Sequence, residues 1–225
     1  MPEPSTMILL GGGLAGIALR VVRQQYVRLK RLSDIILASV ALVLSMPCLL
    51  VLMILVKLTS HGPVFYRQMR VGLHGKLFEI IKLRTMCADA EAKTGPVWAK
   101  QNDPRVTPIG NLLRKTHLDE LPQLINVLNG DMSMVGPRPE RPHFVRQFVQ
   151  QFPDYSKRLD VRPGITGLAC IRVHYDETAT DVRRKLGLDL IYVRRMCWLV
   201  DFRIMMETLR FLTGRGHCHQ PAPKT

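Results

Sequence analysis

The chain has 225 residues, of which 47% are hydrophobic, and it carries a formal net charge of +14 with a pI near 10.1. This length favours one folded domain with a membrane element over two full domains. A basic and half-apolar chain suggests contact with an anionic membrane or with phosphate-bearing ligands. Only 6% of the residues are aromatic and no binding module is recognisable, so we expect no nucleic-acid partner.

Cysteine and histidine do not form the patterns of a disulfide framework or a zinc site. The five cysteines are odd in number, lie far apart and never occur as a C-x-x-C pair. The seven histidines show no metal-ligand spacing. We therefore expect free thiols in a reducing, cytosolic setting.

The first apolar stretch, residues 7–19, is too short to cross a membrane as a helix. Glu3 replaces the positive start of a secretory signal, so we expect residues 1–29 to form an interfacial or packing segment. Residues 11–16 match the dinucleotide fingerprint G-x-G-x-x-G, which requires a second strand ending in an acidic residue about 20 positions on. Asp34 lies near that distance but precedes the next apolar run. The glycines fit a helix-packing face at least as well, which makes a dinucleotide oxidoreductase the weakest alternative.

The run from Ile35 to Val56 contains 22 residues without a charged side chain, which is long enough to cross a hydrocarbon core as a helix. Ser45-Met46-Pro47 falls at its middle, where a proline removes one backbone hydrogen bond and clashes with the preceding turn. We predict a membrane helix over residues 30–57 with a sharp kink.

Basic residues flank this run on both sides, which leaves the positive-inside rule without a preferred direction. They are Arg20, Arg23, Arg28, Lys30 and Arg31 before the run, and Lys57, Arg67 and Arg70 after it. A kinked helix that enters and leaves on the cytosolic side satisfies both flanks. A helix that spans the membrane is the alternative.

The remaining chain predicts a mixed, mostly helical domain. Residues 63–66 and 76–82 favour two short strands around a turn at 72–75, which predicts a hairpin. Three prolines between residues 136 and 142 predict a rigid irregular loop. Apolar residues interleaved with arginines predict a last long helix over about 181–212, which lies on a bilayer surface or packs on the core.

Two short helices are predicted between the hairpin and this loop. Thr107 and Pro108 are typical of an N-cap and a first helical residue, and the helix is expected to run to about Leu118. Leu121 precedes Pro122 and is expected to leave helical angles, so that Pro122 begins a second helix that ends at Asn129-Gly130.

Asp119 and Glu120 form an adjacent carboxylate pair at this predicted helix N-terminus. The unpaired backbone N–H groups there favour carboxylate and phosphate. An ionised carboxylate can act as a nucleophile on phosphorus or as a ligand to Mg²⁺. A capping pair on a solvated helix start is the alternative interpretation.

Basic side chains on rigid elements could bind phosphate close to this pair. Such residues follow the second predicted strand, precede the carboxylate pair by five positions and occupy the proline-rich loop. The candidates are Lys82, Arg84, Arg114, Arg138 and Arg141. A solvated basic face is the alternative.

Six ordered motifs resemble those of the bacterial sugar transferase family, the monotopic polyprenyl-phosphate phosphoglycosyl transferases that initiate exopolysaccharide, capsule, O-antigen and glycoprotein glycan assembly. The resemblance covers the chain from about Lys30 to Leu212. The motifs are residues 30–34 (KRLSD), 82–86 (KLRTM), 103–110 (DPRVTPIG), 118–124 (LDELPQL), 130–139 (GDMSMVGPRP) and 162–167 (RPGITG).

The resemblance implies transfer of a sugar 1-phosphate from a nucleoside diphosphate sugar, usually a UDP-sugar, to undecaprenyl phosphate with Mg²⁺. It implies that Asp119 is the nucleophile and contacts Mg²⁺, that Glu120 assists it, and that Arg114 binds phosphate. Arg138 matches a nucleotide-contacting region. The family's re-entrant helix is kinked at a Ser-Pro pair, whereas here Met46 separates the serine from the proline.

The expected protein is therefore mainly α with a small β-hairpin, monotopic, with a kinked re-entrant helix and a compact cytosolic catalytic domain at the bacterial inner membrane. The expected segments are residues 1–29, the membrane helix 30–57, the catalytic domain 58–213 and a flexible tail 214–225. Its partners would be membrane lipid, polyprenyl phosphate and a nucleotide-sugar, and a homo-oligomer is compatible with the sequence. A membrane-anchored scaffold without activity is the alternative function.

Overall fold

The computed structural model describes residues 4–87, 90, 103–173 and 179–213, with side chains from residue 23 onward. The predicted tail at 214–225 lies outside these residues. The described part is mainly helical and contains two small two-stranded sheets. This confirms the predicted mainly α fold with a β-hairpin element.

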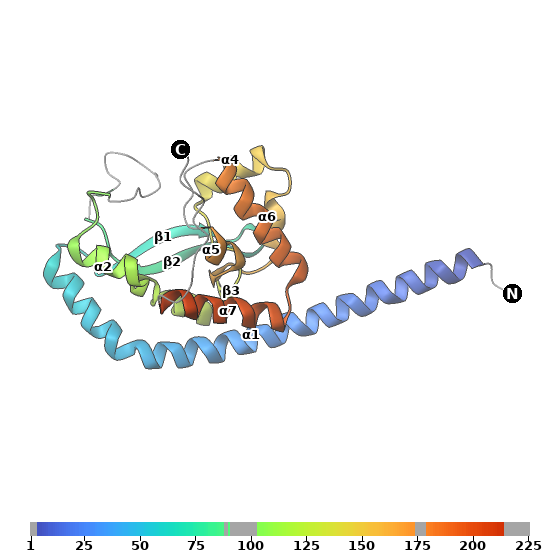
Figure 1. The fold of residues 1–225 in the computed structure, drawn as a ribbon, viewed down its shortest axis with the longest axis horizontal. Helices are drawn as coiled ribbons and strands as arrows, with labels where there is room; N and C mark the ends of the chain where they lie inside the picture. The colour runs from blue at the N-terminus through green and yellow to red at the C-terminus, as the bar shows by residue number, and fades with distance from the viewer. Residues whose placement is uncertain (1–3, 88–89, 91–102, 174–178, 214–225) are drawn as a thin grey trace.

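A single helix, α1, runs from Pro4 to Thr59 and dominates the shape of the molecule. It extends far beyond the rest of the protein at its N-terminal end and then passes along the base of the domain (Figure 1). No break separates the predicted segments 1–29 and 30–57. The glycines of the fingerprint-like motif lie inside this helix, so no strand precedes them and the dinucleotide loop is excluded.

Pro47 lies inside α1 without ending it. Two residues earlier, Ser45 Oγ donates to the carbonyl of Leu42 at 3.2 Å, a side-chain contact that often accompanies a bent helix. The ribbon of α1 bends in its C-terminal third (Figure 1). Whether this bend turns the helix back within a bilayer stays a prediction.

One face of α1 is buried in the domain, and the opposite face is exposed and apolar. Ala38, Leu49, Leu52 and Val56 are at most 7% exposed, whereas Val43 and Leu44 are more than 70% exposed. Among the described residues, the stretch Arg23–Thr59 is long and apolar enough to cross a membrane. Only 17% of its most apolar 18-residue segment is buried in the protein. The helix therefore presents an apolar surface that the domain does not cover.

The predicted hairpin is present. Strands β1 (Phe65–Val71) and β2 (Leu77–Leu83) pair antiparallel, with Phe65 opposite Leu83. The turn is the short 3-10 helix η1 (Leu73–Gly75), in which His74 and Gly75 both have positive φ, at 52° and 81°. Inward side chains of β2 pack on α1 and on the helix that follows the carboxylate pair.

Helix α2 (Pro108–Thr116) begins as predicted, because Thr107 Oγ1 accepts a hydrogen bond from the N–H of Gly110 at 3.0 Å. It ends two residues earlier than expected, since His117 adopts left-handed angles and caps it. Helix α3 (Gln123–Asn129) ends as predicted at Gly130, whose φ is 92°.

The prediction for the connection between α2 and α3 was wrong. Leu121 keeps right-handed helical angles, φ −51° and ψ −39°, although a proline follows it. Its N–H donates to the carbonyl of Leu118, so that Leu118–Glu120 form the short 3-10 helix η2. Asp119 and Glu120 therefore lie within this turn and not at the N-terminus of α3.

A parallel strand pair went unpredicted. Strand β3 (Ser133–Val135) pairs with β4 (Gly164–Thr166). The two backbone segments approach so closely at Gly136 and Gly164 that neither position has room for a Cβ atom. An irregular loop follows β3, as predicted, and leads into α4 (Pro142–Gln151). The 3-10 helix η3 (Tyr155–Asp160) and the short helix α5 (Leu168–Arg172) complete this region.

The last predicted helix is two helices, α6 (Ala179–Arg195) and α7 (Trp198–Leu212). Between them Cys197 is extended, with φ −160° and ψ 169°, although no glycine or proline marks the break. The change of direction lets the first turn of α7 reach α1, where Asp201 contacts Tyr26 and Lys30. Tertiary contacts of Asp201, described below, override the local helical preference here.

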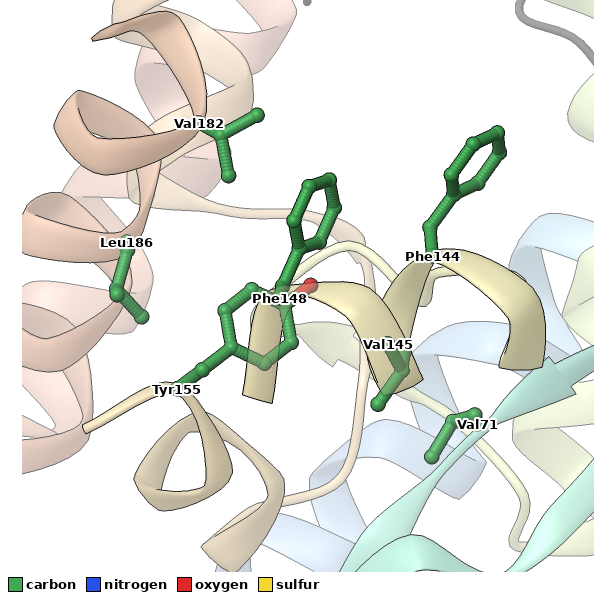
Figure 2. Close-up of a cluster of buried hydrophobic side chains, with 7 residues drawn as sticks. All are labelled: Val71, Phe144, Val145, Phe148, Tyr155, Val182 and Leu186. Carbon is green, nitrogen blue, oxygen red and sulfur yellow. The ribbon is translucent and has the colours of Figure 1, made fainter. Parts of the chain in front are cut away.

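A buried aromatic and aliphatic cluster joins α4, η3 and α6 (Figure 2). Phe148 of α4 lies against Tyr155, with 5.3 Å between ring centroids. The cluster consists of Val71, Phe144, Val145, Phe148, Tyr155, Val182 and Leu186. Because α4 directly follows the irregular loop, this packing fixes the end of that loop.

Candidate active site

The 3-10 helix η2 carries Glu120, and two other elements bring cationic side chains to it. The strand β2 supplies Lys82, whose Nζ lies 2.7 Å from Glu120 Oε1. The loop after β3 supplies Arg138, whose Nη2 donates to the same oxygen, while its Nη1 donates to Glu120 Oε2 at 3.2 Å. Both oxygens of one carboxylate are thus held by two cations.

Asn126 explains why β2 meets η2 at this point. Its Oδ1 accepts from the N–H of Ile81 at 3.0 Å, and its Nδ2 donates to the carbonyl of Glu79 at 2.7 Å. The side chain is 1% exposed. It fastens α3 to the edge of β2, and the register that results places Lys82 opposite Glu120.

Charge and burial act in opposite directions on Glu120. Burial alone would raise its pKa, but Arg138 and Lys82 together hold the pKa well below its usual range. Burial lowers the pKa of Lys82, and Glu120 opposes that change. Glu120 is therefore ionised and committed to its two partners, which makes it a structural anchor of the site.

Asp119 has a different environment. It is 7% exposed, and its carboxylate accepts no hydrogen bond from any residue that the structure describes. Burial raises its pKa, with Glu120 adding to the effect, while Lys82, Arg138 and Arg114 oppose it. Three cations thus surround a buried carboxylate whose oxygens remain free for a ligand.

Arg114 belongs to the same site. Its Nε donates to Thr85 Oγ1 at 2.9 Å, which orients the guanidinium along β2. Burial lowers its pKa, and the charge of Asp119 is the largest opposing influence. Thr85 also anchors the helix that carries Arg114, because its carbonyl accepts from the N–H of Thr107 at 3.0 Å.

Arg84 follows Lys82 by two residues and lies directly after the end of β2. Its Nη2 donates to the carbonyl and the hydroxyl of Ser60, at 2.8 and 2.7 Å. Although Arg84 is only 5% exposed, its Nε and Nη1 have no hydrogen-bond partner among the residues described. Such orphaned donors are rare, and they suit an anionic ligand.

Arg141, the fifth predicted basic residue, occupies a different position. It is the N-cap residue of α4 and lies near Arg70. Burial lowers the pKa of Arg70, and Arg138 and Arg141 lower it further against the opposing charge of Glu140. The structure thus places Lys82, Arg114 and Arg138 around the dyad and Arg84 directly after β2, whereas Arg141 lies at the start of α4.

Arg158 supports the site and went unpredicted. Its side chain is 8% exposed, forms an ion pair of 2.7 Å with Asp189 and donates to Tyr155 Oη at 2.7 Å. Its Nη2 also donates to the backbone carbonyl of Arg138 at 2.8 Å. Arg158 is 20 positions from Arg138 and 31 from Asp189, so no local pattern in the sequence indicates this link.

The carboxylates of the dyad fit one mode of Mg²⁺ binding. Among the described residues, no group of three or more His, Cys, Asp or Glu side chains is arranged to hold a metal ion. Mg²⁺ does not require such a group, because it binds through one or two carboxylates together with water and substrate phosphates. The uncommitted Asp119 carboxylate fits that mode of binding, whereas Glu120 is occupied.

The fold and site define a helical domain that holds a carboxylate dyad among lysine and arginine side chains and packs on a long helix with one exposed apolar face. A family model described as bacterial sugar transferase matches residues 25–215. The chain belongs to this family. A short second match, to a PEP-CTERM protein-sorting motif, covers residues 2–24, of which residues 4–24 lie in the N-terminal part of α1.

The similar proteins include transferases named for undecaprenyl phosphate and a protein named for exopolysaccharide production. The chain is 43% identical to a UDP-N-acetylgalactosamine-undecaprenyl-phosphate N-acetylgalactosaminephosphotransferase of Aeromonas hydrophila, over 85% of this chain and 45% of the relative. It is 38% identical to a UDP-glucose:undecaprenyl-phosphate glucose-1-phosphate transferase of Caulobacter vibrioides, over 92% and 76%. An exopolysaccharide production protein PSS of Rhizobium leguminosarum is 39% identical over 84% and 96%. The chain thus spans less than half of the Aeromonas relative and nearly all of the Rhizobium one.

Proposed function

We propose that this protein transfers a sugar 1-phosphate from a UDP-sugar to undecaprenyl phosphate through a covalent phosphosugar intermediate on Asp119. The family and the names of the relatives support the reaction class and both substrates. The observation that carries the choice of nucleophile is the contrast within the dyad. Glu120 is held by Lys82 and Arg138, whereas Asp119 is buried and free of hydrogen bonds from the described residues.

In the first step an Asp119 oxygen attacks the phosphorus that bears the sugar. The bond between this phosphorus and the bridging oxygen breaks, and the nucleoside monophosphate leaves with the bonding electron pair. In the second step an oxygen of undecaprenyl phosphate attacks the same phosphorus and releases the Asp119 carboxylate. Two substitutions replace one difficult transfer between bulky substrates.

The cations have separate tasks in this proposal. Lys82 and Arg138 keep Glu120 ionised and in place, and their charges favour the ionised form of Asp119. Arg114 and the orphaned donors of Arg84 provide charge-assisted hydrogen bonds for phosphate oxygens. Arg138 is 42% exposed, so it can also contact a nucleotide that enters from solvent.

Mg²⁺ is the cofactor we propose, with Asp119 as its protein ligand. When bound, it supplies positive charge that neutralises phosphate oxygens and orients the substrate. The chain's own contribution is to hold a single uncommitted carboxylate among three cations and away from bulk water.

We further propose that α1 is inserted in the bacterial inner membrane and that the domain faces the cytosol. The exposed apolar side of α1 and the basic flanks on both sides of its apolar run support this placement. The acceptor lipid would then reach the site from the bilayer. Ser60 directly follows α1 and contacts Arg84, which links the helix end to a candidate phosphate ligand.

The test is to incubate the protein with UDP-sugars in the absence of lipid acceptor and to weigh the intact protein by mass spectrometry. The unmodified protein should gain the mass of one phosphosugar, and Asp119→Asn should gain none. Asp119→Asn preserves size, so both proteins should unfold at closely similar temperatures. An adduct on Asp119→Asn would remove Asp119 as the nucleophile, and the absence of any adduct or released UMP would favour the scaffold alternative.

A further inference from the structure

A cavity of about 640 Å³ lies on the molecule away from the dyad, and it shares no lining residue with the site described above. Its walls come from α1, η1, the chain after η3 and the end of α6. Five basic side chains line it: Arg23, Arg28, Lys30, Arg31 and Arg162. Two carboxylates also line it, those of Asp34 and Asp160.

The positive charge in this cavity exceeds what its own carboxylates offset. Lys30 is paired with Asp201 at 2.6 Å, outside the lining. Asp34 accepts from Ser133 Oγ at 2.8 Å and from the N–H of Met134 at 3.1 Å, so its oxygens are engaged by the protein. Hydrogen bonds from these neutral donors do not cancel the charge of a carboxylate, so the lining sets its five basic side chains against Asp34, which lies 4.0 Å from Lys30, and the exposed Asp160.

Two of these arginines are held in place by neutral acceptors. Arg31 donates to the carbonyls of Val127 and Leu128, at 2.5 and 2.9 Å, and Arg162 donates from Nε to the carbonyl of Gly130 at 3.0 Å. These bonds satisfy the C-terminal end of α3 and fix both guanidinium groups beside one another. Neither guanidinium forms an ion pair with a carboxylate among the described residues, and the pKa of Arg31 is lowered by burial and by Arg162 against the opposing charges of Asp34 and Asp131.

The other two arginines are available to a ligand. Arg28 is exposed, and no hydrogen bond or ion pair joins it to the described residues. Arg23 is also exposed and has one long contact, 3.5 Å from its Nη2 to the carbonyl of Val193. Because neither side chain holds another element in place, both can turn towards an anion at the cavity mouth.

The cavity is also partly apolar. Val27, Leu73, Val161 and Met196 contribute to its walls. A free inorganic anion gains nothing from such walls, whereas an amphiphile with an anionic head can use both the arginines and the apolar lining.

The place of the cavity along α1 matches the depth of a lipid headgroup. Arg31 precedes the uncharged run that starts at Ile35 by four residues, a rise of about 6 Å along a helix. The headgroup layer on each side of a bilayer is about 5 to 8 Å thick. Insertion of α1 from Ile35 onward would therefore place Arg31 level with the phosphates of the surrounding lipids, while Arg28 and Arg23 begin about 10 and 18 Å before the run, on the water side of the cavity.

We propose that this cavity binds the phosphate-bearing headgroup of an anionic membrane phospholipid, separately from the substrates of the dyad. The inference rests on the proposed insertion of α1. It adds a second phosphate site, which fixes the depth and rotation of the membrane helix by holding one lipid at its border.

The experiment is native mass spectrometry of the full chain in detergent, titrated with phosphatidylglycerol, phosphatidylcholine or inorganic phosphate and with no polyprenyl phosphate present. The test variant is Arg23→Gln with Arg28→Gln. The control variant is Arg183→Gln with Arg184→Gln, which removes two charges from exposed positions of α6 outside the cavity. In detergent no charged bilayer surface contributes to binding.

We expect one phosphatidylglycerol to bind tightly to the unmodified protein and to the control variant. The hydrogen bonds of two arginines to the headgroup contribute enough that the test variant should bind it about thirtyfold more weakly. Phosphatidylcholine should bind weakly to all three proteins. Equal binding of phosphatidylglycerol by the test and control variants, or of both lipids by the unmodified protein, would overturn the proposal.

Inorganic phosphate distinguishes a lipid site from a site for a free anion. It should not displace phosphatidylglycerol at equal concentration, and displacement would show that the apolar part of the lipid contributes nothing. Failure of this proposal is distinct from failure of membrane insertion, because a protein that is not inserted would leave the membrane fraction after a high-salt wash. A chain that stays with the membrane yet binds no phosphatidylglycerol would reject the cavity site alone.

Discussion

The side chain of Arg158 donates a hydrogen bond to the backbone carbonyl of Arg138, 2.8 Å away. The same guanidinium forms a buried ion pair with Asp189 and contacts Tyr155. The loop that carries Arg138 is therefore held from the side opposite Glu120. The position of Arg138, for which we propose a role in substrate binding, thus depends on Arg158, which lies outside the proposed substrate contacts.

Arg158→Lys should weaken substrate binding while largely preserving the fold. A lysine keeps the charge beside Asp189, but a single ammonium group cannot hold Asp189, Tyr155 and the Arg138 carbonyl as the planar guanidinium does. Loss of one such hydrogen bond costs about 1 kcal/mol, so the KM for the UDP-sugar should rise severalfold with a smaller change in kcat. Steady-state kinetics of UMP release would check this, and an unchanged KM would contradict the positioning role.

Arg158→Met should instead damage the whole fold. It leaves Asp189 buried and unpaired, and removing one partner of a buried ion pair typically costs about 3–5 kcal/mol. Lys157→Met is the matched control, because the adjacent Lys157 pairs with Asp154 at the surface and should unfold like the unmodified protein. Thermal unfolding in detergent separates the two variants.

The acid limb of the rate should shift when Lys82 is replaced by methionine. Asp119 must be ionised to attack, and its pKa is raised by burial, so activity falls as the pH drops through that raised pKa. Lys82 is the largest influence that lowers this pKa. Lys82→Met should therefore move the acid limb to higher pH, besides lowering the maximal rate. A pH–rate profile with an unmoved acid limb would show that another group sets it.

The contribution of Glu120 to the stability of the fold should depend on pH. Its pKa is held well below its usual range in the folded protein, so its contribution to stability is present above the unfolded pKa and is lost as the pH falls through the folded one. Glu120→Gln removes this contribution. The difference in unfolding temperature between the two proteins should be largest near neutral pH and should shrink towards acid pH. A constant difference would indicate that the carboxylate charge is irrelevant.

Asp201→Asn should loosen α7 from α1. One oxygen of Asp201 accepts from Tyr26 and Lys30, both at 2.6 Å, and the other accepts from Tyr192 at 2.9 Å. Neutralising this buried acceptor leaves Lys30 without its close partner and should cost about 3–5 kcal/mol. Glu207→Gln, on the same helix but in an exposed pair with Arg172, should cost less than about 1 kcal/mol. Equal unfolding temperatures for the two variants would contradict this role of Asp201.

Single cysteines at exposed positions before and after the apolar run should report its topology. Gln24→Cys and His61→Cys, each in a cysteine-free background, should both react with an impermeant reagent from the cytosolic side only. Labelling from opposite sides would show that α1 spans the membrane. This outcome would leave the assignment of Asp119 untouched.

Elements with local signals were predictable from the sequence, and elements set by distant contacts were not. The Thr107 cap and the glycine stop at Gly130 produce helix ends wherever the rest of the chain folds. The break at Cys197 has no such signal, because Asp201 must reach residues of α1 that lie more than 170 positions earlier. The pairing of β3 with β4 likewise depends on two segments that lie about 30 residues apart in the sequence.

The residues of the candidate site were likewise predictable from the sequence only in part. The dyad and its basic neighbours stood out by residue type, yet their roles could be separated only through geometry. Asp119 and Glu120 are adjacent and chemically similar, and only the contacts of Lys82 and Arg138 show that one carboxylate is occupied. The helical angles at Leu121 were missed because the cost of helical angles before a proline is a preference that packing overrides.

Leu49, Leu52 and Val56 of α1 share one buried cluster with Leu83 of β2 and Leu113 of α2. Helix α1 is thus a wall of the same core that supports β2, the strand that carries Lys82. Removal of α1 to obtain a water-soluble domain would take away part of that core and expose Leu83 and Leu113. Heating should accordingly melt helix and domain in one cooperative transition, and detergents that compete for the helix should inactivate the enzyme before they release it.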